Sequence, residues 1–376
     1  MRVLVCGAGP AGLYFSYLLK RRNPDCELRV VEQNRADSTF GFGVVFSDRA
    51  LEFLRGDDPA TYRLITPQME AWSDITVVHR GTPVVIDGIG FAAIGRLKLL
   101  QLLQQQAASV GVIPEYEKTV SEEDGYDLIV AADGLNSLVR RGFEKEFGAS
   151  VSHATNKFAW YGTSKRFATL SQTFVKTDLG AFNAHHYRYS PSMSTFLVEC
   201  DAATWQAYGF EHKTIEQSQA ICEEIFVDTL NGHALVSNKS VWRNFPWIWN
   251  ENWSHGNMVL IGDALHTAHF SIGSGTRLAI EDAIALTKAL EAEPEIPAAL
   301  ARYQAERKPI VQKLVTAART SADWYEHFPK HMNLDLMDFA YSYITRSGRI
   351  ADARLRAMSP EFMARYEAEK NIGSRA

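Results

Sequence analysis

Paired cysteines, an excess of basic residues and long apolar runs are all missing from this sequence of 376 residues. The four cysteines (Cys6, Cys26, Cys200 and Cys222) form no C-x-x-C pair, which is typical of reduced thiols and not of a disulfide framework or a zinc site. A formal net charge of -5 argues against general nucleic-acid binding, and no apolar run reaches membrane-spanning length. The N-terminus lacks the features of a signal peptide. We therefore expect a soluble, cytoplasmic protein that binds neither nucleic acid nor membrane.

A glycine-rich turn lies near the N-terminus, between a predicted strand and a predicted helix. Gly7 permits the tight turn, Gly9 lets a pyrophosphate approach the backbone, and Gly12 lets helix and strand pack closely. Glu32 ends the next predicted strand, where a carboxylate can accept hydrogen bonds from ribose hydroxyls. This unit predicts a dinucleotide site, with a glycine turn of an unrelated α/β fold as the less favoured alternative, and it does not separate NAD from FAD.

Two later segments favour FAD. Asp133 and Gly134 end a buried strand, although a tight turn alone can explain that pair. Asp263 follows another buried strand and can accept hydrogen bonds from a ribityl chain. Gly273 and Gly275 then open a helix whose N-terminus can stabilise the negative charge of a reduced flavin. Each feature alone is also a turn or a cap, but as an ordered set they predict an FAD site.

The periodicity along the chain predicts an α/β fold with three parts. These are a Rossmann-type FAD-binding domain, an inserted antiparallel-sheet substrate domain and a C-terminal helical segment. The middle of the chain alternates like strands and is interrupted by one expected helix over Thr214–Leu230. We expect the FAD-binding domain to comprise residues 1–74, 92–155 and 255–296, the substrate domain residues 75–91 and 156–254, and the helical segment residues 297–376.

The three motifs, in this order, resemble those of single-component FAD-dependent aromatic hydroxylases of the para-hydroxybenzoate hydroxylase type. Arg96 begins a helix reading Arg-x-x-Leu-Leu-x-Leu-Leu and matches the family's arginine that reaches the FAD phosphates and ribityl chain. Within the family, several segments look like the branch that holds salicylyl-CoA 5-hydroxylase, and some are shared with a tryptophan-derived pigment hydroxylase. These segments are residues 40–48, 156–163, 184–189, 194–199, 266–276 and 339–347.

The resemblance implies the reaction. NADH or NADPH binds transiently and reduces the bound FAD, O₂ adds to give a C4a-hydroperoxyflavin, and one oxygen atom passes to an electron-rich aromatic ring. The implied substrate is salicylyl-CoA, hydroxylated para to its hydroxyl group to give gentisyl-CoA. Phe270 and Arg277 stand where the wider family has proline and asparagine. Aryl-CoA hydroxylases are often fused to a second, reductase-like flavoprotein unit, and we expect that second activity to be absent here.

Two histidines are the candidate catalytic groups. His266 and His269 lie in one loop beside the expected flavin ring, and histidine is the side chain best suited to accept a phenolic proton near neutral pH. Either ring can instead simply hydrogen-bond the loop backbone. A metal site from this H-x-x-H pattern is not expected, because no third ligand follows with suitable spacing.

The substrate site is expected to have aromatic and polar walls. On an alternating strand His185 and Tyr187 face one side and the next residues face the other, and we favour His185 and Tyr187 as the pair that lines the cavity. Phe270 can form one wall, and Tyr161 is a candidate wall or core residue. A CoA thioester would also need cations for its phosphates, for which the sequence offers Lys157, Lys165, Arg166 and Arg243 without ranking them.

Several alternatives stay open at this level. The segment 245–249 has some likeness to an aromatic signature of flavin halogenases, although a packed strand is the simpler interpretation. The substrate can be a free indole or another natural-product ring instead of a CoA thioester. A reductase, a halogenase or a flavin-binding sensor that turns over little are the more distant alternatives.

Overall fold

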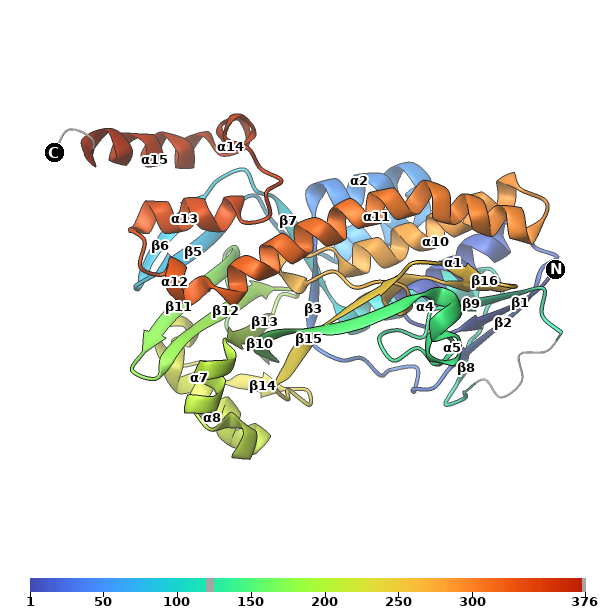
Figure 1. Ribbon diagram of the computed structural model, residues 1–376, viewed down its shortest axis with the longest axis horizontal. Coiled ribbons are helices and arrows are strands. Elements are labelled where there is room, and N and C mark those ends of the chain that lie inside the picture. The colour runs from blue at the N-terminus through green and yellow to red at the C-terminus, as the bar shows by residue number, and fades with distance from the viewer. Residues whose placement is uncertain (120–124, 374–376) are drawn as a thin grey trace.

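A computed structural model describes residues 1–119 and 125–373 (Figure 1). Its first sheet has a parallel centre in which β1 pairs with β2 on one side and β9 on the other, and β9 pairs with β17. This is the Rossmann-type arrangement that the glycine motifs predict. In spatial order the strands are β16 (Ser254–His255), β17 (Met258–Leu260), β9 (Leu128–Ala131), β1 (Arg2–Cys6), β2 (Glu27–Glu32) and β8 (Glu115–Tyr116).

Helices α1, α4 and α10 pack around this sheet, and α10 packs in turn against the long helix α11. Proline at the start of α1 suits that end because its missing N–H has no helical partner there. These four helices are α1 (Pro10–Arg22), α4 (Arg96–Ser109), α10 (Gly275–Ala292) and α11 (Ile296–Glu326). The shorter helices of this half are α2 (Asp48–Asp57), α3 (Pro59–Ile65), α5 (Leu138–Gly142) and α6 (Glu144–Phe147).

The second sheet is mainly antiparallel and confirms the expected inserted sheet; β11 pairs with β5 in parallel. Its order is β14 (Leu235–Ser237), β10 (Ala149–Thr163), β13 (Ser194–Cys200), β12 (Gly180–Arg188), β11 (Leu170–Thr177), β5 (Ile75–His79) and β6 (Thr82–Ile86), with β15 (Arg243–Asn250) pairing with β10 outside this path. The expected boundary between residues 155 and 156 falls inside β10, because this single strand runs on from the first half of the molecule into the second.

The structure differs from the sequence-based expectation at two places. The single helix expected over Thr214–Leu230 is divided into α8 (Ile215–Ile225) and α9 (Val227–Leu230), because Phe226 leaves the helical conformation with φ −106° and ψ 25°. The helix α7 (Ala202–Ala207) precedes them. A third sheet, absent from the expectation, is formed by β3 (Gly43–Ser47), β7 (Phe91–Gly95) and β4 (Glu70–Trp72). Its strands are short, and β7 contains alanines that carry little strand signal.

The C-terminal helices share a core with the second sheet. Aromatic residues of α11 and α13, including Trp324, Tyr325 and Phe339, pack with Phe174 of β11. Figure 1 shows α13 beside β5 and β6, with α14 and α15 beyond it at the end of the molecule away from the N-terminus. Within the described ranges, none of the helices combines the length and apolar character needed to cross a bilayer. The helices are α12 (Phe328–His331), α13 (Leu336–Thr345), α14 (Asp352–Met358) and α15 (Pro360–Gly373).

A buried ionic network joins α10 and α11 to the first sheet. Asp282 of α10 accepts hydrogen bonds from Arg307 Nε at 2.9 Å and from the Gly262 N–H at 3.1 Å, and it contacts His266 Nε2 at 2.9 Å. Burial alone would raise the pKa of Asp282, but the charges of His266 and Arg307 hold it below its usual value. The carboxylate is therefore ionised at neutral pH and holds three segments of the chain together.

We predict that Asp282→Ala lowers the free energy of unfolding by about 3 kcal/mol, because it leaves Arg307 buried with only Glu281 as an ionic partner. Urea denaturation of the FAD-loaded protein measures this change. The pKa of Asp282 is lowered on folding, so its contribution is present at neutral pH and is lost as the pH falls through the lowered pKa. Glu291→Ala, which breaks the exposed pair with Arg22, is the control and should cost less than about 1 kcal/mol. Equal losses for the two variants would contradict the prediction.

Candidate active site

The turn between β1 and α1 has open space beside one glycine, whereas the other two glycines are in close contact with backbone atoms. Gly7 has φ +102°, and a Cβ there would lie 2.4 Å from the Ala132 oxygen. A Cβ on Gly12 would lie 2.0 Å from the Gly7 oxygen, so this glycine is required by the contact between helix and strand. A Cβ on Gly9 would meet no atom within 4 Å. The free N–H groups at the start of α1 therefore face open space, as an anion site requires.

Glu32 closes the other side of this space. Its Oε1 accepts hydrogen bonds from the N–H and the Nδ2 of Asn34 at 2.8 and 2.7 Å, and its Oε2 accepts from the Ala8 N–H at 2.9 Å. Oε2 keeps a lone pair that is able to accept from a ribose hydroxyl. A cavity of about 170 Å³ lies here, lined by Gly9, Glu32 and residues reaching to Arg96 and Thr276.

Arg96 lines this cavity, and Asp263 lies close enough for the two charges to interact. The Arg96 guanidinium lies over the Trp160 ring at 5.4 Å, and its backbone N–H donates to the Phe42 oxygen at 2.7 Å. The Asp263 side chain is exposed to solvent, yet many protein atoms lie close around it. Desolvation by these atoms raises the pKa of its carboxyl group, and the charge of Arg96 opposes the rise. Two opposite charges therefore lie near each other at the end of the cavity.

The two remaining flavin motifs also leave acceptors and space. Asp133 Oδ2 accepts from the Leu138 N–H at 2.7 Å, while Oδ1 is buried without a hydrogen-bond partner. Gly134 has φ +75°, so the tight turn considered for this pair is present as well. Gly273 has φ +60°, and a Cβ there would lie 2.9 Å from Val45 Cγ1. Gly275 begins α10 with no atom within 4 Å of a Cβ position, so this helix N-terminus is also open.

These observations fit FAD. The start of α1 and Gly9 would hold the pyrophosphate, Glu32 the adenosine ribose, and Arg96, Asp133 and Asp263 the polar groups between phosphate and ring. The start of α10, after Gly273, would face the ring itself. Among the described residues no cluster of three or more histidine, cysteine, aspartate or glutamate side chains is arranged to hold a metal ion.

His269 and Phe270 lie in a cluster of aromatic rings contributed by the second sheet and by α11. The His269 ring centre is 4.8 Å from Phe245 of β15, and Phe270 is 5.0 Å from Phe158 of β10 and 5.2 Å from His185 of β12. Rings arranged in this way exclude water and offer flat walls to an aromatic substrate. The structure thus brings His185, His269 and Phe270 together, as their assignment to one site predicts.

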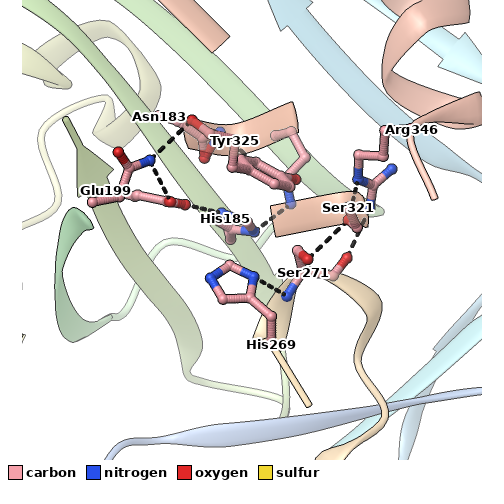
Figure 2. A network of polar contacts seen from close by, with 10 residues as sticks. Asn183, His185, Glu199, His269, Ser271, Ser321, Tyr325 and Arg346 are labelled. Carbon is pink, nitrogen blue, oxygen red and sulfur yellow. Dashed lines mark hydrogen bonds and ion pairs between the residues drawn. The ribbon is translucent and has the colours of Figure 1, made fainter. Parts of the chain in front are cut away.

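A chain of buried hydrogen bonds extends from this cluster (Figure 2). Glu199 of β13 accepts from Asn156 Nδ2 at 2.9 Å and contacts His185 Nε2 at 3.2 Å. His185 Nδ1 lies 2.9 Å from Gln172 Nε2, and Gln172 Oε1 accepts from the Tyr325 hydroxyl at 3.3 Å. Glu199 is 1% exposed, and burial raises its pKa. An acidic group therefore lies inside the site without any lysine or arginine within 4 Å among the described residues.

Arg346, at the end of α13, joins the same network from the other side (Figure 2). Its Nη2 donates to the Ser271 oxygen at 2.8 Å, its Nε to Ser321 Oγ at 3.1 Å and its Nη1 to the Tyr343 oxygen at 2.7 Å. Its guanidinium lies over the Tyr343 and Tyr325 rings at 4.0 and 5.5 Å. The loop after His269 is thus fixed to the C-terminal helices by a cation.

The hydrogen bonds assign a tautomer to each histidine of the cluster. His269 Nδ1 accepts from the Ser271 N–H at 3.3 Å, so the proton of the neutral ring lies on Nε2. His185 Nδ1 accepts from Gln172, so its Nε2–H donates to Glu199. Burial lowers the pKa of His185 to about 3 and that of His269 to about 4, so both rings are neutral at pH 7. In this tautomer the free nitrogen of His269 is a hydrogen-bond donor, whereas the expected acceptance of a phenolic proton requires the other tautomer.

Two candidate site residues lie elsewhere. His266 was expected to be catalytic, but its ring contacts Asp282 and packs against Trp253, so it belongs to the network that holds α10 and α11. Tyr161 was expected to line the substrate site, but it packs with Phe196 and the helices after β13 on the opposite face of the second sheet. Neighbouring residues of β10 face opposite sides, and it is Phe158 that reaches Phe270.

Strand β12 alternates as expected, although only one residue of the favoured pair reaches the aromatic cluster. His185 lies in the cluster, whereas the Tyr187 hydroxyl donates to the Gly43 oxygen at 2.9 Å and ties β12 to β3. His186 faces the other side, stacked on Phe196 and bonded to Thr173. Tyr187 thus supports the strand beside Arg96 and makes no contact with His269.

Sequence reasoning missed three residues of the network: Glu199, Tyr325 and Arg346. A lone acidic residue in the apolar strand Ser194–Cys200 was a usable signal for Glu199. No local pattern marks Tyr325 or Arg346, because their place depends on how α11 and α13 dock. The segment 245–249 is part of a strand, which confirms the simpler of the two interpretations. Its aromatic rings also line the site.

The fold and this site define a class. Residues 96–318 match the FAD binding domain family, and the chain belongs to that family of flavin-dependent monooxygenases. Such enzymes use FAD to hydroxylate aromatic rings, so this chain is an FAD-dependent aromatic monooxygenase.

More specific likeness comes from individual relatives. The chain is 42% identical to salicyloyl-CoA 5-hydroxylase of a Streptomyces species, over 92% of this chain and 70% of that enzyme. It is 36% identical to the 3-hydroxy-4-methyl-anthranilyl-[aryl-carrier protein] 5-monooxygenase of Streptosporangium sibiricum, over 93% and 95% of the two chains. It is 33% identical to protodeoxyviolaceinate monooxygenase of Chromobacterium violaceum, over 96% of each.

Solved structures support the fold. 2-Methyl-3-hydroxypyridine-5-carboxylic acid oxygenase aligns with a TM-score of 0.71 and 16% identity, over 95% of this chain and 96% of that one. PqsL of Pseudomonas aeruginosa, solved with 2-aminobenzoylacetate, aligns with a TM-score of 0.70 and 20% identity, over 92% and 100%.

We predict that Gly9→Ala and Gly12→Ala fail in different ways. Gly9→Ala adds a methyl group to open space, so the apoprotein should keep its melting temperature while its affinity for FAD falls about tenfold or more, since the methyl group occupies pyrophosphate space. Gly12→Ala should instead lower the melting temperature of the apoprotein, because its Cβ meets backbone at 2.0 Å. Flavin fluorescence titration and calorimetry measure the two effects. A Gly9→Ala protein with normal FAD affinity would contradict the assignment of this space.

Proposed function

We propose that this monooxygenase hydroxylates salicyloyl-CoA, the salicylyl-CoA of the sequence-based expectation, at the ring carbon para to its hydroxyl group, giving gentisyl-CoA. The observation that carries the proposal is the 42% identity to a salicyloyl-CoA 5-hydroxylase over 92% of this chain. The aromatic walls at Phe158, Phe245 and Phe270 suit a single flat ring.

Bound FAD, reduced by NADH or NADPH, supplies the activated oxygen in this family. The chain's own residues orient the ring, exclude water and control the charge of its hydroxyl group. A phenolate oxygen donates electron density to the para carbon, which is where an electrophilic oxygen attacks. The Nε2–H of His269 can donate to an acceptor of the bound substrate and help to hold the ring in place. His269 then serves as a positioning donor, and the phenolic proton leaves by another route.

The CoA tail needs a path that leads away from His269, and the face of β15 toward α11 supplies one. Aromatic side chains alternate along this strand, and cations of α11 lie over two of them. The contacts are Phe245–His269 at 4.8 Å, Arg319–Trp247 at 5.1 Å and Lys308–Trp249 at 5.7 Å. A groove of about 490 Å³ follows, lined by Lys308, Gln312 and Asn252 among others. Of the cations suggested by the sequence, Arg243 lies on this strand, whereas Lys157 lies over Trp205 of α7.

Arg319→Ala should raise the KM for salicyloyl-CoA about tenfold, the loss of one charge-assisted contact with a phosphate. The value of kcat should stay unchanged, because Arg319 lies outside the aromatic cluster. Arg302→Ala is the matched control: it removes another exposed arginine of α11, one that pairs with Glu293 and Glu306. Steady-state kinetics measure both parameters, and equal KM values for the two variants would exclude this path for the CoA tail.

The substrate itself is tested by NADH and NADPH oxidation and by product mass. Salicyloyl-CoA should stimulate oxidation strongly and gain one oxygen atom, whereas free salicylate should do neither. Stimulation by a tryptophan-derived ring, in line with the Chromobacterium relative, would replace the substrate assignment. Stimulation by an anthranilyl carrier-protein thioester would mean that the substrate is a thioester, but of a carrier protein and not of CoA. Absence of any stimulation with bound FAD would favour a flavin-binding sensor, and halide in the product would favour a halogenase.

A further inference from the structure

Arg346 has hydrogen-bonding capacity that the protein does not use. A guanidinium carries five N–H donors. One donates to Ser321, one to Tyr343 and one to Ser271. Each terminal nitrogen therefore keeps one N–H free of these bonds, and the pair can meet an oxygen anion as a fork.

The charge of Arg346 is also uncompensated. Within the described residues no carboxylate lies within 4 Å of its guanidinium, and its nearest ring neighbours are Tyr343 and Tyr325. The side chain is half-buried, so solvent screens the charge only in part. That charge reaches the aromatic cluster, because it contributes to lowering the pKa values of both His185 and His269. An oxygen anion that reached Arg346 would therefore gain a charge-assisted hydrogen bond without competing with an acidic side chain.

Glu199, a buried carboxyl group that accepts hydrogen bonds from Asn156 and His185, lies at the other end of the network; burial raises its pKa. Figure 2 shows His185 and His269 between Glu199 and Arg346. The titratable groups that face this space are Glu199, His185, His269, Tyr325, Tyr343 and Arg346. The two histidines are neutral, so Arg346 and Glu199 set the field across the site.

We propose that Arg346 binds the phenolate oxygen of the aromatic substrate, and that Glu199 repels this anion from the opposite end so that it stays on the arginine side. The inference rests on the proposed function, since it requires a phenolic substrate. Binding then ionises the hydroxyl group: the O–H bond breaks, its electron pair stays on oxygen, and the proton is released to solvent. Arg346 thereby selects rings with an ionisable hydroxyl group and prepares them for oxygen transfer.

A purely structural role for Arg346 makes a different prediction. If it only clamps the loop at Ser271 onto α11 and α13, its loss disturbs binding and stability without a defined effect on the ionisation of the substrate. An electrostatic role fixes the sign of two effects. Removing the positive charge must make the bound phenol harder to ionise, and removing the negative charge at Glu199 must make it easier.

The test is a pH titration of bound salicyloyl-CoA in the oxidised, FAD-loaded enzyme without NAD(P)H, so that no turnover occurs. The phenolate absorption in the difference spectrum gives the pKa of the bound phenol. Arg346→Gln should raise that pKa by about one unit or more, a tenfold change in ionisation. Arg346→Lys keeps the charge and should shift it less. Glu199→Gln should lower it. Circular dichroism and FAD content check that each variant is folded.

The outcomes separate the two proposals when free salicylate and a hydroxylated anthranilate are titrated in parallel. Binding of salicyloyl-CoA with equal phenol pKa values in all variants overturns the inference and leaves the substrate assignment standing. No binding of salicyloyl-CoA, with the opposite shifts seen for another phenol, overturns the substrate assignment and supports the inference. Failure of every phenol to bind overturns both. If Arg346→Gln does not fold, the directions of the shifts in the pKa of the bound phenol for Arg346→Lys and Glu199→Gln still test the inference.

Discussion

The antiparallel pairing of β10 with β15 is the constraint on which the site depends. It runs from the Ala149–Asn250 pair to the Phe158–Arg243 pair, with a register shift between His153 and Lys157. Strand β15 is also bonded to the loop before the flavin motif, because Thr267 and Ile248 exchange hydrogen bonds at 2.9 and 3.1 Å. Strand β15 thereby ties the second sheet to the loop that carries His269 and Phe270, and rings of that sheet meet these two residues.

The second property that the fold gives to the aromatic cluster is the exclusion of water. Rings from three strands and α11 surround the histidines, and both are neutral; His185 is hydrogen-bonded at both ring nitrogens and His269 at one. In such surroundings charges act over longer distances than they do in water. The proposed effect of Arg346 and Glu199 on substrate ionisation depends on these dry surroundings, although neither residue belongs to the flavin motifs.

The cofactor half of the molecule could be predicted from sequence because its requirements are local. Gly7, Gly12 and Gly273 are each explained by a positive φ or a close backbone contact within a short motif. The histidine loop could not be resolved in this way. His266 and His269 are three positions apart, yet one turns toward α10 and the other toward β15.

The substrate half depends on which face of a strand meets which neighbour. Alternation placed His185 and His186 on opposite sides correctly, but it cannot say which side of β10 faces the flavin, and so Tyr161 was misplaced. The role of Arg346 could not be predicted from the sequence for the same reason. Its role is set by the docking of α13 against residues 271 and 321, a contact between segments far apart in the sequence.

The order of these segments along the chain has a consequence for biosynthesis. The groups that would hold FAD all precede residue 276, whereas the polar network also needs Tyr325 and Arg346. A chain emerging from the ribosome releases the flavin-binding segments first, and N-terminal units generally fold before later ones. The nascent protein therefore has the means to capture its flavin before it has the means to organise a ring for oxidation. The polar network is complete only once α13 and Arg346 have been synthesised.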